Sequence, residues 1–386
     1  MIRTLFVALV FALPVIAQET RVAVTDDATL RRALAAAKPG SRIVLAPGKY
    51  RAGLEIINVR GSADKRLVIE AADPKDKPVI EGGRLGIHVR GCAYVTLRNL
   101  VVRGAAGNGI NVDDGGSPDT PGQFITIESV DVADIGPRGN TDAIKLSGVD
   151  DSIVRDCTLA GWGGEGIDMV GCHRVLVENC TFRGKPGFGQ TCAVQAKGGS
   201  TDVTIRACAF VYAAQRAVNL GGSTGAPFYR PKDANYEAKN ILVEGCRFTG
   251  SLAPICFVGI DGSTVRYNTF DRPEKWVVRI LQETRTPGFV PSRNGRFEHN
   301  LIVADSRTLR SAINSSDATD PASFVFASNW WFSPDRPAAS RPELPSPERD
   351  GVYGTDPRLK TADDGAPGAP ADPNAAAYGH AGLPKK

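Results

Sequence analysis

A short strand-like pattern recurs along most of this chain and constrains its fold more than any other feature. Runs such as VTLRN, SIVRDC, VLVENC and FVFASN each join a few β-branched or apolar residues to one Asn, Cys or Ser. A period of this length, with insertions between the runs, is typical of a solenoid. The runs end 22 to 38 residues apart, at Asn99, Ser129, Cys157, Cys180, Cys208, Cys246, Asn268, Asn300 and Asn329. The sequence therefore predicts an all-β fold, a right-handed parallel β-helix of about ten coils.

Composition agrees with many short strands and turns. The chain has 42 Gly and 26 Pro against only 2 Met and 4 Trp, and 42% of its residues are apolar, enough for a packed core. Its 46 basic and 42 acidic residues leave a net charge of +4. A nucleic-acid-binding protein would show a concentrated basic excess, so the charge balance argues against that class.

The two ends of the chain differ from the repeats. Arg3 and the apolar run that ends at Ala17 predict a signal peptide, residues 1–17, and therefore a secreted protein, extracellular or periplasmic. After cleavage we expect no membrane segment, and we expect a monomer. The β-helix domain is predicted over 18–335, with a helix from Thr25 or Asp26 to about Ala37 covering its open end. Residues 336–386, rich in Pro, Ala and Asp, are predicted to be a tail that wraps on the last coils or is partly disordered.

Four of the eight cysteines recur at the end of the repeated run. Cys157, Cys180, Cys208 and Cys246 are predicted to stack in the same column as Asn99, Asn268 and Asn300, as buried thiols or buried amides. A disulfide between adjacent coils, such as Cys157–Cys180, stays open as an alternative because neighbouring coils are close enough. No Cys-x-x-Cys pair or His cluster has zinc spacing, so a metal–thiolate site is not expected.

A third strand in each coil carries polar side chains between apolar ones, such as AIKL and GIDM. Because strand residues alternate between faces, the polar ones should line one outer face, beside the longest loops, 221–238 and 282–294. Such a face suits an extended, hydroxyl-rich polysaccharide. The central column is His88, Asn111, Lys145, Asp168, Gln195, Asn219, Cys256 and Arg279. Two residues further along lie Arg90, Asp113, Ser147, Val170, Lys197 and Gly221, and three residues before it lie Asn108, Asp142, Glu165, Cys192, Arg216 and Trp276.

Three stretches resemble secreted β-helix polysaccharide lyases of the chondroitinase B and alginate lyase type. They are LRRALAAAKPGSRIVLAPGKY with GSADKRLVIEA near the start, WGGEGIDMVG at 162–171 and AVQAKGGSTDVTI at 193–205. With the repeat, the likeness covers about Asp26–Trp331. The resemblance implies a carbon–oxygen lyase that cleaves uronic-acid-containing glycans by β-elimination, with Lys197 as the catalytic lysine.

The chain departs from this family at two places. Where the family has an arginine on the next coil, this chain has Gly221, so we expect Arg216 or Arg279 to supply that cation. Where the family has calcium-binding acids, it has Gln190 and Cys192, so the resemblance implies no calcium and we expect no cofactor. The remaining candidates are expected to bind substrate: Lys145, Glu165, Asp168, Gln195, Asn219, Tyr229 and Arg230.

Two other functions stay open. Paired carboxylates among Asp113, Asp142, Glu165 and Asp168 could hydrolyse a glycosidic bond, and the same acids could instead bind Ca²⁺. Tyr229 and Tyr236 could donate a proton, stack on sugars or only pack their loop, whereas His88 is expected to be peripheral. The second of these functions is that of a non-catalytic carbohydrate-binding β-helix.

Overall fold

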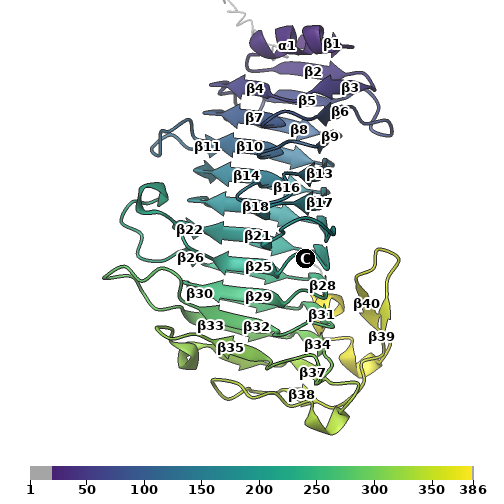
Figure 1. The fold of residues 1–386 in the computed structure, drawn as a ribbon, viewed down its shortest axis with the longest axis vertical. Helices are drawn as coiled ribbons and strands as arrows, with labels where there is room; N and C mark the ends of the chain where they lie inside the picture. The colour runs from purple at the N-terminus through teal and green to yellow at the C-terminus, as the bar shows by residue number, and fades with distance from the viewer. Residues whose placement is uncertain (1–19, 385–386) are drawn as a thin grey trace, which may run out of the picture.

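The chain winds into a long stack of coils, and its strands form three parallel sheets (Figure 1). The computed structural model describes residues 20–384, so the predicted signal peptide lies outside the described residues. Each coil contributes one strand to each sheet in turn, and most neighbouring strands therefore come from successive coils. None of the helices within the described range is long and apolar enough to cross a membrane.

The three sheets are numbered in the order in which each coil visits them. The first sheet has twelve strands: β1 (Thr20–Val24), β2 (Ser41–Leu45), β5 (Leu67–Ala71), β8 (Val95–Arg98), β12 (Thr126–Glu128), β16 (Ile153–Arg155), β19 (Leu176–Glu178), β23 (Thr204–Arg206), β27 (Ile241–Glu244), β30 (Asp261–Arg266), β33 (Arg293–Glu298) and β36 (Val325–Ala327). The second also has twelve: β3 (Lys49–Arg51), β6 (Val79–Glu81), β9 (Val101–Arg103), β13 (Asp131–Ile135), β17 (Thr158–Trp162), β20 (Thr181–Arg183), β24 (Ala209–Val211), β28 (Arg247–Thr249), β31 (Thr269–Asp271), β34 (Leu301–Val303), β37 (Trp330–Phe332) and β38 (Val352–Tyr353). The third has ten: β4 (Leu54–Ile57), β7 (Ile87–Arg90), β10 (Ile110–Asp113), β14 (Ile144–Ser147), β18 (Glu165–Val170), β21 (Cys192–Lys197), β25 (Arg216–Gly221), β29 (Ala253–Val258), β32 (Val278–Leu281) and β35 (Ile313–Ser315).

The remaining elements are short. Two parallel pairs lie beside the main sheets, β11 (Gly122–Gln123) with β15 (Val149–Asp150), and β22 (Ser200–Thr201) with β26 (Ala238–Lys239). One antiparallel pair lies near the C-terminus, β39 (Leu359–Thr361) with β40 (Pro367–Pro370). Single 3₁₀ turns occur at η1 (Ala226–Phe228), η2 (Pro321–Ser323), η3 (Pro337–Ala339), η4 (Pro373–Ala375) and η5 (Gly379–Gly382).

Helix α1 (Asp27–Ala35) lies at the N-terminal end of the stack (Figure 1). Asp26 is its N-cap, and its side chain accepts a hydrogen bond from the backbone N–H of Thr29 at 2.8 Å while the Thr29 hydroxyl accepts from the Asp26 N–H. This reciprocal capping satisfies two N–H groups that the first helical turn leaves unpaired. Leu30 and Ala33 face inward and join the core of the first coils.

One continuous hydrophobic core fills the coils because the inward residue of each strand stacks on its equivalent in the next coil. The second sheet shows this most clearly, since its inward positions carry phenylalanines. The rings of Phe182, Phe210, Phe248 and Phe270 stack at centroid distances of 4.8, 4.6 and 4.7 Å. These spacings equal the distance between neighbouring strands, so the aromatic stack reports the register of the coils directly.

The turn that follows the first sheet corrects two positions in the predicted column. Strand pairing aligns Arg98 with Glu128 and then with Arg155, so the residues equivalent to Cys157 are Leu100 and Val130. Asn99 and Ser129 lie one position earlier, with φ of 56° and 53°. That left-handed position tolerates Asn well and needs no inward side chain, which explains the one-residue error.

Further along the chain the column is as predicted. All eight cysteines are within the described part and are buried free thiols, so no Cys157–Cys180 disulfide forms. Asn268, Asn300 and Asn329, here called the asparagine ladder, are fully buried. Each Nδ2 of the first two donates to the next Oδ1, at 3.1 and 3.0 Å, and each Oδ1 also accepts a backbone N–H of the coil before.

The C-terminal segment runs back along the outside of the second sheet, as Figure 1 shows in yellow. Its β38 first extends that sheet beside β37. Asp364 then forms an ion pair with Arg247 of β28, and the ring of His380 hydrogen-bonds Thr269 of β31 at 2.7 Å. This segment therefore wraps on earlier coils and covers the second sheet, whereas the predicted polar column lies on the third.

Candidate active site

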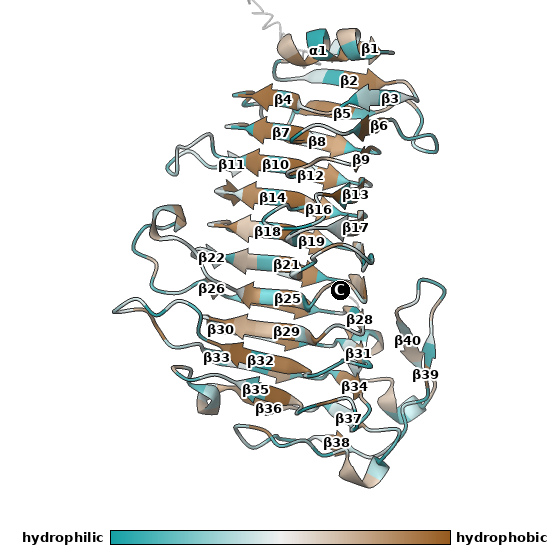
Figure 2. Cartoon of the chain, in the orientation of Figure 1, coloured by the Kyte–Doolittle hydropathy of each residue, from teal (hydrophilic) through white to brown (hydrophobic). Residues whose placement is uncertain are grey.

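The third sheet brings the predicted outer column into one register. Strand pairing places His88, Asn111, Lys145, Asp168, Gln195, Asn219, Cys256 and Arg279 side by side on eight successive strands, with Asn314 of β35 next in line. The apolar residues on either side of each one face the core. Figure 2 shows the resulting hydrophilic interruptions in the otherwise hydrophobic strands β21 and β25. The predicted column is therefore in register on one sheet, but its middle members Asp168, Gln195, Asn219 and Cys256 are buried rather than exposed.

Three carboxyl groups meet on this face. Asp142 precedes β14, and Glu165 and Asp168 belong to β18. Their nearest oxygens all lie within 4.8 Å of one another. Asp142 and Asp168 are fully buried, and only Glu165, at 8% exposure, retains contact with solvent. Because like charges in a buried site disfavour ionisation of all three, nearby cations must compensate.

Two lysines supply that compensation. Lys145 forms an ion pair with Asp168 and lies 3.2 Å from Asp142 Oδ2, and Lys197 Nζ lies 3.6 Å from Asp168 Oδ1. We call Asp142, Lys145, Glu165, Asp168 and Lys197 the acid–lysine cluster. Burial opposes the charge of Asp168, but Lys145 and Lys197 outweigh it and hold the pKa of Asp168 below its ordinary value. Burial likewise opposes the charge of Lys145, but Asp168 and Asp142 raise its pKa.

Glu165 differs from its two neighbours. Burial, followed by the charges of Asp168 and Asp142, raises its pKa to about 8. At neutral pH this carboxyl therefore keeps its proton, whereas Asp168 a few ångströms away is ionised. Carboxyl groups whose pKa values are pushed apart in this way can act as a proton donor beside a fixed negative charge.

Amide groups continue the network toward the C-terminal coils. Gln195 donates to Asp168 Oδ1 at 3.1 Å and accepts from Asn219 Nδ2 at 2.7 Å. Arg216 donates to Asn219 Oδ1 at 3.4 Å and forms an ion pair of 2.8 Å with Glu283. Arg216 thus lies at the edge of the cluster, two coils from Glu165 in the same column.

Arg279, the other predicted catalytic cation, has different partners. Its guanidinium lies over the ring of Trp276, 4.3 Å from the centroid, and donates to Asn314 at 2.9 Å. Two strands separate it from Gln195, whereas Arg216 is linked through Asn219 and Gln195 to Asp168, the ion-pair partner of Lys197. Cys256, between them in the column, is a buried thiol whose pKa burial raises to about 11.

Asp113 also lies apart from the other acids. It hydrogen-bonds His88 Nε2 at 2.6 Å and Asn111 at 3.0 Å, at the N-terminal end of the stripe. The four acids proposed for a Ca²⁺ site are therefore split into a group of three and a single residue. A Ca²⁺ ion takes six to eight oxygens, and two of the three grouped carboxylates already pair with lysine ammonium groups.

The loop that follows β25 is tied down beside Lys197 by a buried carboxylate. Glu237 accepts hydrogen bonds from the Gly198 N–H at 3.0 Å, from the Thr224 hydroxyl at 2.7 Å and from the hydroxyls of Tyr229 and Thr284. Burial and Glu237 together raise the pKa of Tyr229. Tyr229 is buried, so its hydroxyl serves this anchor within the loop.

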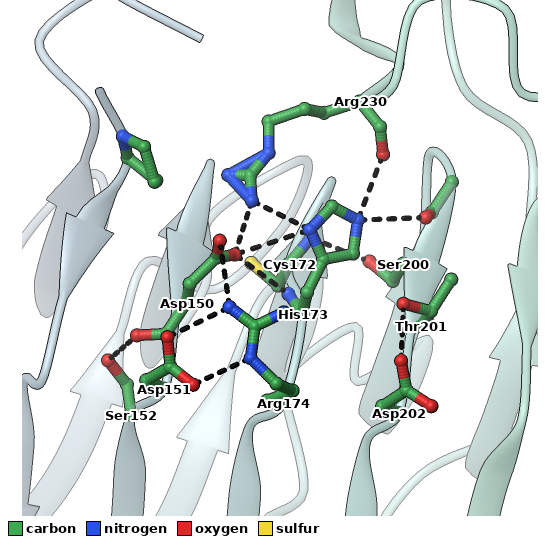
Figure 3. Close-up of polar contacts among 12 residues, drawn as sticks. Asp150, Asp151, Ser152, Cys172, His173, Arg174, Ser200, Thr201, Asp202 and Arg230 are labelled. Carbon is green, nitrogen blue, oxygen red and sulfur yellow. Dashed lines mark hydrogen bonds and ion pairs between the residues drawn. The ribbon is translucent and has the colours of Figure 1, made fainter. Parts of the chain in front are cut away.

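A second anchor holds the same loop at Arg230. Its guanidinium forms an ion pair with Asp150 and donates to His173 Nδ1 at 2.7 Å (Figure 3). His173 Nε2 lies 3.2 Å from the Arg230 carbonyl and 3.3 Å from the Gly199 carbonyl. Carbonyls only accept hydrogen bonds, so Nε2 carries the hydrogen and Nδ1 accepts from Arg230.

Sequence reasoning did not find Glu237, Asp150, His173 or Glu283. Each acts through a loop or an edge strand whose path the periodicity does not predict. The only signal was the length of the 221–238 and 282–294 loops, and both are held by Glu237 through Tyr229 and Thr284. Tyr236, another candidate, lies under Lys239 at 5.9 Å, away from these contacts.

Comparisons with known proteins support the fold. Residues 85–230 match the family model described as "Right handed beta helix region". An alginate lyase from Paenibacillus sp. str. FPU-7 is similar, with 17% identity, a TM-score of 0.51, and 78% of this chain and 97% of that chain covered. A mannuronic-acid-specific polysaccharide family 6 lyase from human gut microbiota has 15% identity and a TM-score of 0.51, covering 85% and 90%.

A glycoside hydrolase shares the fold as well. The GH136 lacto-N-biosidase from Eubacterium ramulus has 13% identity and a TM-score of 0.57, covering 87% of this chain and 68% of that one. No curated protein matches this chain in sequence. At these identities the similarity establishes a right-handed parallel β-helix, and the chemistry has to be argued from the residues of the site.

Proposed function

We propose that this protein degrades a uronic-acid-containing polysaccharide by β-elimination at the acid–lysine cluster. The observation that carries this proposal is which charged groups on the third sheet can reach a ligand. Side chains of Lys145, Lys197 and Arg216 are 16%, 17% and 22% exposed, and Glu165 is the one carboxyl of the cluster with solvent contact. The fold is one that alginate and mannuronate lyases also use, which is consistent with such a substrate.

Elimination assigns a role to each of these groups. Cations beside the uronate carboxylate neutralise it and make the adjacent C5 proton more acidic; Arg216, with its planar fork, and Lys145 fit this role. Lys197, held to Asp168 by the longer ion pair of 3.6 Å, acts as the base after its ammonium group has released a proton to solvent. Lys197 takes the C5 proton, the C4–O bond breaks as a C4–C5 double bond forms, and protonated Glu165 donates its proton to the leaving oxygen.

Hydrolysis is the second candidate, because Glu165 stays protonated beside ionised Asp168. A hydrolase needs a second carboxylate that can reach the sugar or a water molecule. Asp168 and Asp142 are fully buried, and Asp168 is bonded to Lys145 and Gln195. The burial of these two carboxylates therefore favours elimination over hydrolysis at this cluster.

An activity screen tests the proposal. The protein is incubated with alginate, pectate, chondroitin, heparinoids and neutral glycans, and both unsaturated ends and new reducing ends are measured. We expect unsaturated uronate, detected by its ultraviolet absorbance, from at least one acidic polymer. Reducing ends without that absorbance would establish hydrolysis in place of elimination. Binding without any cleavage would show a carbohydrate-binding module.

A further inference from the structure

A cavity of about 370 Å³ lies at one edge of the third sheet, next to the acid–lysine cluster. Its floor includes Ser147 and Val170 at the ends of β14 and β18, and its walls come from the loop after β10 and from residues 227–232. Both loops extend from the same edge of the sheet in Figure 1. We call this cavity the loop pocket. Its volume is in the range that holds small ligands.

The loop pocket begins one strand away from the proposed site. Val170 pairs in register with Lys197 on the next strand, so their backbones are separated by one strand spacing of about 4.8 Å. Ser147 pairs with Val170 and Asp113 with Ser147, which carries the pocket two further strands along the stripe. A chain of sugars bound at Lys197 would therefore extend into the loop pocket.

Side-chain contacts of two of its residues hold the wall formed by residues 227–232 in place. Arg230 reaches Asp150 and His173, as Figure 3 shows, and Tyr229 is fixed by Glu237. The anchoring contacts of Tyr229 and Arg230 are buried or nearly so. They position the wall without covering the pocket. A rigid wall costs little entropy when a ligand binds, which favours affinity.

Phe228 is the unusual residue of this wall. It lines the pocket, yet 68% of its surface is exposed, the largest value among the exposed large apolar residues of the described chain. The anchored neighbours Tyr229 and Arg230 hold the backbone that presents it. An aromatic ring left in solvent at the mouth of a pocket can pack against the apolar face of a ligand.

Hydrogen-bonding groups line the same pocket as the ring. Asp113 at the end of β10 and Asp114 after it supply carboxylate oxygens, and Lys232 supplies an ammonium group beside the Pro227 carbonyl. Carboxylates accept hydrogen bonds from hydroxyl groups, and an ammonium group donates to hydroxyl, ring or carboxylate oxygens. One aromatic face with acceptors and a donor around it matches a pyranose ring, which has an apolar face and a polar rim.

We propose that the loop pocket is a subsite for one sugar ring of the polysaccharide, with Phe228 as its stacking platform. The inference rests on the proposed function, and it deepens that function by placing a substrate unit beside the cleavage point. Occupancy of this subsite requires a chain long enough to extend from Lys197 past Val170. Phe228 is therefore a binding residue that discriminates by chain length, separate from the groups that carry out the cleavage.

Phe228→Ala tests the proposal with uronate oligosaccharides of increasing length. We expect KM for long chains to rise about tenfold with little change in kcat, and KM for the shortest cleaved chains to stay unchanged. Phe228→Trp should restore the affinity for long chains. Ile57→Ala is the matched control, because Ile57 is also exposed, at 46%, on the same sheet but outside the pocket.

Binding measured by calorimetry in the Lys197→Ala background separates the two proposals. Tenfold weaker binding of long chains by the Phe228→Ala double variant supports the subsite even where the parent protein cleaves nothing, a result that would reject only the lyase function. Cleavage by the parent with equal KM for Phe228→Ala at every length would overturn the subsite and leave the lyase function standing. Absence of both binding and cleavage over the whole panel would overturn both.

Discussion

The asparagine ladder and the acid–lysine cluster both gather polar side chains from successive coils, most of them buried, but their partners differ. In the ladder the amides satisfy each other and the turn backbone, at 2.9 to 3.1 Å. In the cluster three carboxyl groups share two ammonium groups. Asp142 Oδ2 has Lys145 at 3.2 Å as an ion-pair partner but accepts no hydrogen bond.

This difference separates a column that stabilises the coils from the cluster at which we propose catalysis. Neutral amides in a closed network gain hydrogen bonds without desolvating charge, so the ladder stabilises the coils. Buried charges gain from pairing roughly what they lose in hydration, so the cluster is weak evidence for stability. Perturbed pKa values concentrated at one point of a regular solenoid instead indicate a site where protons are moved.

The largest expected effect is on activity in the cluster. Lys197→Ala removes the proposed base and should lower the elimination rate by ~10²–10⁴-fold. Asp168 keeps Lys145 and Gln195 as partners, so the midpoint of thermal unfolding should change little. The measurement is the initial rate of unsaturated-uronate formation, with circular dichroism as the check on the fold.

Lys239→Ala is the control for that experiment, because Lys239 lies on edge strand β26 and contacts Tyr236 rather than the cluster. Its rate should equal that of the parent protein. Full activity in Lys197→Ala would remove Lys197 from the mechanism. Equal losses in both variants would point to a general effect of surface charge on binding an acidic polymer.

In the asparagine ladder we expect the reverse result, a loss of stability without a loss of elimination rate. Asn300→Ala leaves the Asn268 backbone N–H without its acceptor in the buried turn, whereas Asn329 Oδ1 keeps the Asn300 backbone N–H. The unsatisfied donor costs about 1–3 kcal/mol and the lost side-chain packing adds to it, so the free energy of unfolding should fall by about 3 kcal/mol. Denaturant unfolding measures this loss, and the elimination rate at low temperature should be unchanged.

Cys208→Ala is the matched variant in the same column. The Cys208 thiol donates only weak hydrogen bonds to carbonyls, the nearer being Arg206 at 3.3 Å, and carbonyls can bond elsewhere. We expect a loss of about 1 kcal/mol, mainly from the missing atom in the core. Equal losses for Asn300→Ala and Cys208→Ala would show that the amide network contributes nothing beyond packing.

The titration of Glu165 gives a smaller effect whose sign can be worked out. The pKa of Glu165 is about 8 in the folded protein, against its ordinary value of 4.5, which applies to the unfolded chain. Between these pH values the folded state holds a proton that the unfolded state has released. The stabilising contribution is therefore complete below pH 4.5 and is lost as the pH rises through about 8, with a slope of at most about 1.4 kcal/mol per pH unit.

Glu165→Gln isolates this contribution, because glutamine does not titrate and all other groups are shared. The free energy of unfolding of the parent protein should fall relative to the variant as the pH rises from 4.5 to about 8. The elimination rate of the parent should also fall as the pH passes about 8, since Glu165 then loses the proton that it donates. Parallel stability curves would mean that Glu165 is already ionised at neutral pH.

Much of this architecture could be predicted from the sequence because strand side chains alternate with a period of two. That period places Lys145, Asp168 and Gln195 in one row as soon as the neighbouring apolar residues are assigned to the core. The same rule fails at turns. Asn99 was placed in the inward column because it is an asparagine at the end of a run, whereas its backbone takes the left-handed conformation and Leu100 points inward.

Loop-borne residues lie beyond such reasoning altogether. Glu237 is 39 residues after Gly198 in the chain and yet bonds its backbone N–H. Nothing periodic links the two, since Glu237 lies in the loop after β25, which has no repeat. The order of pKa values in the cluster could not be predicted either, because it depends on which carboxyl the lysines pair with, and a sequence does not show that Lys145 and Lys197 both reach Asp168.

The smallest effect is expected from the redox state of the eight cysteines, four of which adjoin the asparagine ladder in the same column. Burial raises the pKa of Cys172 to about 12, and it raises the pKa of Cys208 as well. Thiolates, the reactive form, are then almost absent at neutral pH. A thiol reagent should therefore label none of the eight cysteines in the folded protein and all eight after unfolding, and a reductant should leave the unfolding midpoint unchanged. A lower midpoint with reductant would instead require a disulfide between coils and would make the thiol part of the column a covalent ladder, unlike the amide part.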